Sequence, residues 1–446
     1  MASYNPNPAV HGNPFLNIPP DTDSNPFRWL SEDIGSVFRL SSLLPRIFLP
    51  LSPFRSGALD ELYPSLSNLR DITLHIILIL IQVFLIISLP FAFITLWPVP
   101  FVVHIVFYGV FVFVTAVVVR LLNGRPTGRS LIGVPTSRHP VNDERELWFF
   151  INGIATGYDI TTTTTTTLPA EQNLGLTPTH PPAHTGTNQT STPSQKYSAG
   201  SRGFLLDLLE CLIQRDLDYK TEDIRKGRAQ LRAALAAPST KKVVLIAHSQ
   251  GGIIASSILD WLFSELGPVE LSKLEVYTFA SAGRALRNPP LRGLDTASHS
   301  YSRSASNSGG DEGAVARARA SNGNGIPGRV LRYVEHYANT KDFVSNIGVL
   351  KFTTPVAAYS YGSLFSGSVF VREGSGHLLN MHYLDTMFGE NGGFMNRMVE
   401  MPVVEEGGVE RIVQRPLGDL SRLWKYRDGE SPEDEAGEED VKGVDY

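Results

Sequence analysis

Residues 243–262 of the chain, VVLIAHSQGGIIASSILDWL, contain the junction that decides the fold. The first five residues are apolar and rich in β-branched side chains, which predicts a buried strand, and a helix with many small residues follows from Gly251. Ser249 stands between the two, with the small residues Ala247 and Gly251 two positions away on either side. Small neighbours let such a turn close tightly and expose the serine hydroxyl. A serine in an ordinary strand–helix turn is the alternative interpretation.

Strand and helix patterns alternate on both sides of this junction. Strands are predicted at residues 146–152, 243–247, 274–279, 330–336 and 368–372, and helices at 204–237 (as one or two), 251–266 and 377–388. The alternation predicts an α/β domain over residues 144–400, with a mostly parallel sheet and helices on both faces. Stretches rich in Thr, Pro, Ser and Gly predict flexible inserts at about 160–200 and 297–328.

The junction resembles the nucleophile elbow of the α/β-hydrolase superfamily, particularly of its lipases and esterases, and the resemblance covers about residues 144–388. The motif here is Ala-His-Ser-Gln-Gly, which departs from Gly-x-Ser-x-Gly in having alanine for the first glycine. The resemblance implies that Ser249 is the nucleophile, and that an acidic residue and then a histidine follow it in the chain.

Asp342 is the acidic residue that the resemblance implies. It follows the predicted strand 330–336, and the string Asp342-Phe343-Val344 looks like the Asp-x-Val found after the equivalent strand of many lipases. Glu335 is an alternative, but it lies within the strand pattern. A helix cap is the other interpretation of Asp342.

Two histidines follow the last predicted strand. His377 comes after Gly374-Ser375-Gly376, which would let the loop approach Ser249, so His377 is favoured as the base. His382 would lie ~140° further around a helix and is the rival base, since both rings could not face one serine. His248, beside the nucleophile, resembles a common feature of lipase elbows and is not expected to be the base, and His336 is expected to pack within its strand.

The resemblance also implies an oxyanion hole made of backbone N–H groups. One donor would be Gln250, which follows the nucleophile. The other would be Ile154, in the string Asn152-Gly153-Ile154 that stands where lipases often have His-Gly-x. A simple turn at Asn152-Gly153 is the alternative. The sequence contains no metal-ligand cluster or phosphate-binding glycine motif, so neither a metal nor a cofactor is expected.

Residues 72–119 contain no Asp, Glu, Lys or Arg. Because ~20 apolar residues cross a bilayer, this segment predicts a transmembrane or membrane-embedded hairpin with helices at 72–96 and 101–119, broken at Trp97-Pro98-Val99-Pro100. A buried helix pair is the alternative. Arginines on both flanks predict that the hydrolase domain faces the cytosol, on an endomembrane such as the endoplasmic reticulum or a lipid droplet. Whether the hairpin spans the bilayer or enters one leaflet stays open.

The terminal segments have compositions of their own. Residues 1–27 and the acidic tail 428–446 predict disorder, and residues 28–70 predict an amphipathic juxtamembrane segment. Asn13-Pro14-Phe15 and Asn25-Pro26-Phe27 resemble peptides bound by EH-type endocytic domains, although turn formation in a tail is the alternative.

Charge and composition narrow the functional classes. Lys and Arg total 39 against 44 Asp and Glu, a net charge of −5, which argues against a nucleic-acid partner. The single cysteine excludes an intramolecular disulfide framework. A hydrolase held at a bilayer is expected to cleave lipid esters through an acyl-serine. The alternatives are a non-catalytic membrane scaffold on a hydrolase fold, and an acyltransferase or thioesterase with the same triad.

Overall fold

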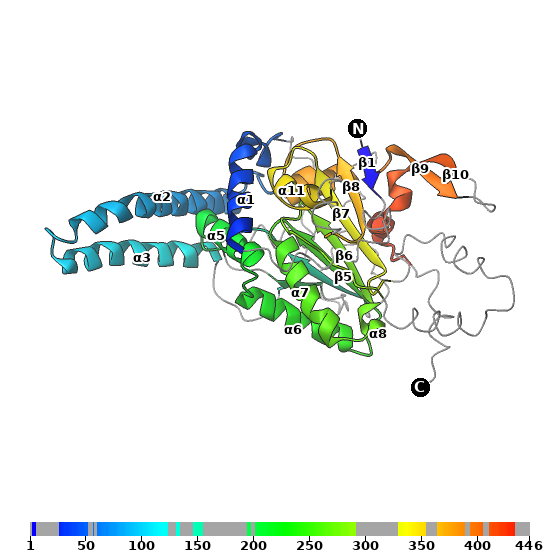
Figure 1. The fold of residues 1–446 in the computed structure, drawn as a ribbon, viewed down its shortest axis with the longest axis horizontal. Helices are drawn as coiled ribbons and strands as arrows, with labels where there is room; N and C mark the ends of the chain where they lie inside the picture. The colour runs from blue at the N-terminus through cyan, green and yellow to red at the C-terminus, as the bar shows by residue number, and fades with distance from the viewer. Residues whose placement is uncertain are drawn as a thin grey trace, which may run out of the picture.

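The chain folds into a β-sheet flanked by helices, and a long helical hairpin projects from one side of this domain (Figure 1). The computed structural model describes residues 2–5, 26–51, 57, 60–123, 131–133, 146–154, 194–197, 201–290, 329–353, 364–388, 393–404 and 410–432. Most of the two predicted inserts and of the acidic tail lies outside these ranges.

Five neighbouring parallel strands form the centre of the sheet. In spatial order they are β3 (Glu146–Ile151), β5 (Lys242–His248), β6 (Leu274–Phe279), β7 (Tyr333–Asn339) and β8 (Ser368–Arg372). On the outer side of β3 lie the parallel strand β4 (Ser194–Tyr197) and the antiparallel β2 (Leu131–Gly133), and β1 (Ala2–Asn5) pairs antiparallel with β8. The predicted mostly parallel α/β sheet is confirmed.

Several strands differ from the sequence prediction, which did not include β2 or the strands at residues 398–404 and 410–416. β1 lies in the predicted N-terminal tail and β4 in the predicted insert 160–200. Each has four residues and pairs with an outer strand of the central five, and such a short segment shows no periodicity that would predict it. β7 begins at Tyr333 rather than at residue 330. The Val330 N–H donates to the Pro289 carbonyl and the Leu331 N–H to the Asn288 side chain, so both residues are held in a loop.

Helices cover the sheet as the alternating pattern predicts. The predicted helical region 204–237 is two helices, α5 (Phe204–Asp216) and α6 (Glu222–Ala236). The others are α7 (Gly251–Glu265), α8 (Pro268–Leu271), α11 (Phe343–Ile347), α12 (Val349–Thr353), the π-helix η3 (Leu379–Leu384), α14 (Asp385–Phe388), and the 3-10 helices η4 (Leu417–Leu420) and η5 (Leu423–Gly429). A separate two-stranded ribbon consists of β9 (Met398–Val404) and β10 (Glu410–Pro416).

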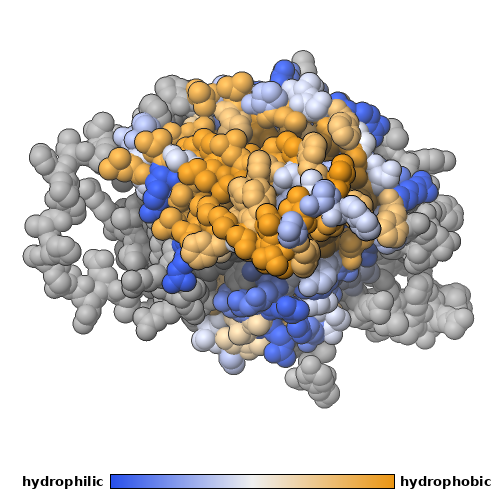
Figure 2. All heavy atoms as spheres, turned by 90° about the vertical axis from the view of Figure 1, so that its left-hand side faces the viewer, coloured by the Kyte–Doolittle hydropathy of each residue, from blue (hydrophilic) through white to orange (hydrophobic). Residues whose placement is uncertain are grey.

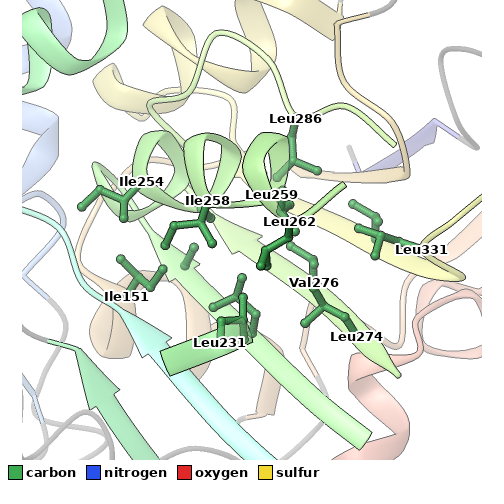
Figure 3. Packing of buried hydrophobic residues seen from close by; sticks show 14 of the residues in the cluster. Ile151, Leu231, Ile254, Ile258, Leu259, Leu262, Leu274, Val276, Leu286 and Leu331 are labelled. Carbon is green, nitrogen blue, oxygen red and sulfur yellow. The ribbon is translucent and has the colours of Figure 1, made fainter. Parts of the chain in front are cut away.

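Alternate residues of β5 enter two apolar cores. Val243 and Leu245 pack with Ile258 of α7 and with α6 on one face of the sheet (Figure 3). Val244 and Ile246 pack on the other face, against η3, α14 and the C-terminal helices. Burial of each such side chain contributes about 1.5–3 kcal/mol. The two cores hold the carboxyl ends of the strands, and the loops that follow them, in place.

The projecting hairpin consists of α2 (Leu66–Thr95) and α3 (Phe101–Asn123). Both helices are longer than predicted, and α2 begins at Leu66 because the Ser65 side chain caps it by accepting the Asn68 N–H. The most apolar 18-residue stretch has a mean hydropathy of 2.8 in α2 and 2.6 in α3. Only 11% and 6% of these stretches are buried, so the helices are not packed in a protein core. Both are long and apolar enough to cross a membrane.

Two short helices precede the hairpin. α1 (Pro26–Arg39) runs across the root of the hairpin, and η1 (Ser41–Ile47) follows it (Figure 1). Pro26 and Phe27 are helical, so the predicted tail ends earlier than residue 27. Asn13-Pro14-Phe15 and Asn25 lie outside the described residues.

Candidate active site

The predicted site residues gather at the carboxyl ends of the parallel strands. Ser249 follows β5, Asp342 follows β7 and His377 follows β8. The strand order reverses nearby, because β4 lies on one side of β3 and β5 on the other. Open parallel sheets bind their ligands at such a reversal, outside the carboxyl ends of the strands.

Ser249 occupies a strained and tightly held turn. Its φ of 59° is in the left-handed region that residues other than glycine rarely adopt. Its N–H donates to the Phe279 carbonyl and its carbonyl accepts the Ala282 N–H, both at 3.0 Å. A Cβ on Gly251 would lie 2.2 Å from the Ile151 carbonyl oxygen, so only glycine lets α7 start this close to β3. The turn therefore presents the Ser249 hydroxyl in one defined position.

Ser249, His377 and Asp342 form a continuous chain of hydrogen bonds. His377 Nε2 lies 3.0 Å from Ser249 Oγ, and His377 Nδ1 lies 3.0 Å from Asp342 Oδ2. A carboxylate only accepts hydrogen bonds, so Nδ1 donates the proton to Asp342 and Nε2 accepts the Ser249 hydroxyl proton. All three residues are buried. The structure thus places the favoured residues together in the order that general-base activation of a serine requires.

Asp342 is held as an ionised acceptor. It caps α11, where its Oδ1 accepts the Val344 N–H at 2.9 Å, and its Oδ2 accepts the hydroxyls of Ser345 at 3.0 Å and Tyr383 at 2.7 Å. Burial acts to raise the pKa of Asp342, but the charge of His377 and these hydrogen bonds outweigh it and hold the pKa below its usual value. Asp342 is therefore both a helix cap and the partner of His377.

His382, the rival base, is hydrogen bonded elsewhere. Its Nδ1 accepts the Leu378 N–H at 3.1 Å, and its Nε2 donates to the Pro50 carbonyl at 2.8 Å. Burial lowers its pKa, so the ring is neutral in this setting. Since both nitrogens are engaged away from Ser249, the structure does not bring His382 into the hydrogen-bond chain.

His248 and His336 are both buried, and packing was predicted for His336. The His248 ring lies 4.8 Å from the His377 ring, and its Nε2 donates to the His377 carbonyl at 2.9 Å. Burial, and then the charge of His377, lower the pKa of His248 to about 3. His336 bonds Thr278 at 2.7 Å and the Ser366 carbonyl at 3.0 Å, and burial lowers its pKa to about 4.

Glu335, the alternative acid, belongs to a different network. Its carboxylate accepts the Arg422 N–H at 2.6 Å and the Tyr337 hydroxyl at 2.6 Å. Burial raises the pKa of Glu335 to about 7, although those hydrogen bonds oppose the effect. Glu335 therefore links β7 to the C-terminal helices rather than to His377.

The predicted oxyanion-hole segments lie beside Ser249. A Cβ on Gly153 would be 2.7 Å from the Ser249 Cβ, so the loop after β3 lies directly against the serine. The Gly153 N–H donates to the Asn152 side chain at 2.7 Å, and Ile154, the donor predicted from the sequence, is the next residue of this loop. Gln250 is the N-cap of α7, where backbone N–H groups have no partner within the helix.

An N-terminal segment that the sequence prediction missed holds the His377 loop. The His377 N–H donates to the Ile47 carbonyl at 3.0 Å. The Glu61 carboxylate accepts the N–H groups of Asn380 at 2.7 Å and Met381 at 3.2 Å. Burial raises the pKa of Glu61 to about 7, against the effect of these hydrogen bonds. No local sequence signal could reveal these contacts, because the partners lie more than 300 residues apart.

The described residues contain no group of three His, Cys, Asp or Glu side chains that could hold a metal ion. Comparisons with protein-family models, curated proteins and solved structures found no match to this chain. The interpretation of the site therefore depends on its own geometry.

Proposed function

We propose that the protein is a membrane-anchored serine hydrolase of the α/β-hydrolase type, which cleaves carboxylic esters of lipids through an acyl-serine. The main support is the hydrogen-bond chain from Asp342 through His377 to Ser249, built on a strained turn. The same three residue types in this arrangement activate a serine hydroxyl on several unrelated folds.

In the first half-reaction, Ser249 Oγ attacks the ester carbonyl carbon and passes its proton to His377 Nε2. Asp342 stabilises the imidazolium that forms. The N–H groups of Gln250 and Ile154 would bind the developing oxyanion, and such a donor typically contributes ~10²–10³ in rate. The intermediate then loses the alcohol, which takes the proton from His377, and an acyl-serine remains.

In the second half-reaction, a water molecule attacks the acyl carbonyl while His377 Nε2 accepts its proton. Collapse of this intermediate breaks the bond to Ser249 Oγ, and the proton returns from His377 to the serine. The products are an alcohol and a fatty acid. Each step uses only side chains and backbone groups of the chain itself, so the proposal includes no cofactor.

The strain at Ser249 favours catalysis over a scaffold function. A left-handed φ at a residue other than glycine costs of order 1–3 kcal/mol, and burial of the ionised Asp342 carboxylate adds a desolvation cost. A scaffold would gain nothing from either. Acyl transfer and thioester cleavage would use the same acyl-serine and would differ only in the acceptor or the donor.

The apolar hairpin supports lipids as the substrate class. Its helices expose apolar side chains along nearly their whole length, and α2 is joined to the domain by the Gln82 side chain, which donates to the Arg202 carbonyl at 2.9 Å. A hydrolase domain tied in this way remains next to a membrane, where acylglycerols, phospholipids and sterol esters are concentrated.

Lipid-ester hydrolysis by the full-length protein in vesicles tests the proposal. The assay measures free fatty acid released from labelled acylglycerol or phospholipid. We expect Ser249→Ala to lose at least ~10³-fold in rate, and the variant of a half-buried serine of α7, Ser256→Ala, to retain the wild-type rate. Equal release by wild type and Ser249→Ala would contradict the proposal. Transfer of the labelled acyl group to a second lipid would show that the protein catalyses acyl transfer and not hydrolysis.

We also propose that the domain faces the cytosol, since arginines flank both ends of the hairpin. Asn188-Gln189-Thr190 is the one Asn-x-Ser/Thr acceptor in the sequence. The protein expressed in cells should therefore not gain an N-linked glycan. A glycan at Asn188 would place the domain in the lumen.

A further inference from the structure

The fully buried residues of helix α1 are polar, whereas several of its large apolar side chains face outward. Asp33 and Ser36 are buried, whereas Phe27, Ile34 and Phe38 are exposed to 72%, 44% and 74%. An amphipathic helix on a soluble domain shows the opposite arrangement, with its apolar face toward the core. The exposed apolar face of α1 therefore calls for an apolar neighbour.

The orientation of α1 is set by ion pairs. Asp33 lies 3.0 Å from Arg215 of α5, 3.1 Å from Arg284 and 3.0 Å from Lys351 of α12. Arg284 also stacks on the Trp29 ring at 3.7 Å. A rotation of α1 that hid its apolar side would break all of these contacts and leave buried charges unpaired, which is costly.

The neighbouring segments show the same inversion. In α5, Asp207 and Asp216 are buried, while Leu206 and Leu209 are exposed. The chain that follows α1 exposes further apolar side chains, namely Leu44, Phe48, Leu49 and Leu51. Exposed apolar side chains therefore occur throughout residues 26–51 and on α5, and not at a single position.

These residues surround the root of the hairpin. Figure 1 shows α1 crossing that root, with α5 beside it. Seen along the hairpin, apolar residues, those of the hairpin itself included, cover the middle of this side of the molecule, and hydrophilic residues lie at its edges and below it (Figure 2). Arg28 and Arg39 of α1 are exposed, next to these apolar side chains. Exposed apolar patches of this extent mark interaction sites.

We propose that the outward face of residues 26–51 and α5 docks on the phospholipid leaflet that the hairpin enters. The inference rests on the membrane anchoring proposed above and adds how the domain lies on the membrane. Continuity with the hairpin surface favours a bilayer as the occupant. Apolar side chains would enter the boundary between headgroups and acyl chains, and the arginines would meet anionic headgroups.

Docking in this way brings the site to the lipid surface. Ile47, the last residue of η1, accepts the His377 N–H, and Pro50 accepts from His382, so the docked segment contacts the histidine loop directly. The substrate class follows from this placement. Esters that reside in the leaflet would reach Ser249 from the membrane side, in preference to esters dissolved in water.

Depth-dependent fluorescence quenching tests the docking. The full-length chain, with its only cysteine changed by Cys211→Ala, receives one fluorophore through Phe38→Cys, or independently through Ile34→Cys. The matched control is Val269→Cys, at an exposed apolar residue of α8, and the hairpin reference is Phe113→Cys. The vesicles contain phosphatidylcholine, phosphatidylserine and a lipid with a nitroxide in the upper acyl chain.

We expect strong quenching at Phe38, Ile34 and Phe113, and at least ~5-fold weaker quenching at Val269, since a fluorophore within the acyl region meets the nitroxide. Quenching at Phe113 without quenching at Phe38 and Ile34 would overturn the docking but not the anchor. Energy transfer between fluorophores at Phe38 of two copies of the chain, without quenching by the lipid, would mean that a second copy covers this face. That result would also overturn the docking. No quenching at Phe113 would overturn the membrane anchor. Quenching as expected in a protein that does not hydrolyse lipid esters would refute the proposed hydrolase activity and leave the docking intact.

Discussion

The carboxylate of Glu61 accepts the backbone N–H of Asn380 at 2.7 Å, across 319 residues of sequence. The second N–H, from Met381, reaches the same carboxylate at 3.2 Å. Both donors belong to the first turn of η3, where N–H groups have no partner within the helix. A buried acid from the segment before the hairpin thus holds the start of the helix that follows His377.

Glu61 makes stability depend on pH. Burial raises its pKa from 4.5 to about 7, so the folded protein binds this proton more tightly than the unfolded chain. The raised pKa of Glu61 contributes to the free energy of unfolding, and this contribution is fully present below pH 4.5. It is lost as the pH rises through about 7, and the loss is roughly 3 kcal/mol. Glu61→Gln removes the titration. Relative to wild type, its free energy of unfolding should improve by roughly that amount between about pH 4.5 and pH 8.

Denaturant unfolding in detergent micelles at both pH values measures this difference. Glu222→Gln is the control, because Glu222 is exposed on α6 and its pKa is lowered by Lys226, so its difference from wild type should change little. If the Glu61→Gln difference stays the same at both pH values, Glu61 is ionised throughout and the account of this contact is wrong.

The two histidines after β8 should respond differently to the same substitution. His377→Gln removes the proposed base and should reduce lipid-ester hydrolysis by at least ~10³-fold. His382→Gln removes hydrogen bonds to Leu378 and Pro50, which should cost about 1–3 kcal/mol of stability and change the rate by less than ~10-fold. Rate measurements at a temperature where both variants are folded distinguish the two. A larger rate loss in His382→Gln than in His377→Gln would assign the base to His382 and the structural role to His377.

Tyr383 is a positioning residue for the acid. Its hydroxyl donates to Asp342 and contributes to the lowered pKa of that carboxyl, so Tyr383→Phe should raise the Asp342 pKa. Loss of one hydrogen bond to a charged group predicts a ~10-fold lower kcat with little change in KM. The acid limb of the kcat profile should also move to higher pH, because Asp342 would then protonate sooner.

Tyr337→Phe is the matched control for this variant. Tyr337 is a buried tyrosine whose hydroxyl donates to Glu335, away from the site. Its substitution should lower stability and leave the acid limb of the profile where it is. An acid limb that moves equally in both variants would show that Tyr383 acts only through stability.

The glycine after the serine turn should tolerate no side chain. In Gly251→Ala, the new Cβ would clash with the Ile151 carbonyl oxygen, and displacement of α7 should cost about 3 kcal/mol or more. Gly35→Ala in α1 meets nothing within 4 Å and should gain about 0.5–1 kcal/mol from helix propensity. Thermal unfolding of both variants in micelles checks the opposite signs, and equal destabilisation would refute the close packing at Gly251.

Sequence patterns predicted the local parts of this molecule well. The strand, turn and helix around Ser249 are specified within 20 residues, and the bounds of β6 and β8 match the prediction. Local patterns placed Ser249, Asp342 and His377 after separate predicted strands, and the resemblance to the α/β-hydrolase superfamily implied their roles; the structure brings the three side chains together. Parallel strands place the loops that follow them along one edge of the sheet, so strand ends far apart in sequence can meet there.

Long-range contacts could not be predicted in the same way. Glu61 and Ile47 reach the His377 loop only through the tertiary fold, and η3 begins at Leu379 rather than at His377. The composition of residues 28–70 predicted an amphipathic juxtamembrane segment, but not the orientation of α1 within it. Asp33 faces inward because of Arg215, Arg284 and Lys351, whose positions depend on three other parts of the chain.

The most direct test of the central claim is labelling by a fluorophosphonate probe, which reacts covalently only with an activated serine. Wild-type protein in membranes should be labelled at Ser249, as located by mass spectrometry of the modified peptide. Ser249→Ala and His377→Gln should both lose the label, while Ser256→Ala should keep it. Wild-type protein that stays unlabelled, or that is labelled equally after Ser249→Ala, would contradict the account of this chain as a serine hydrolase.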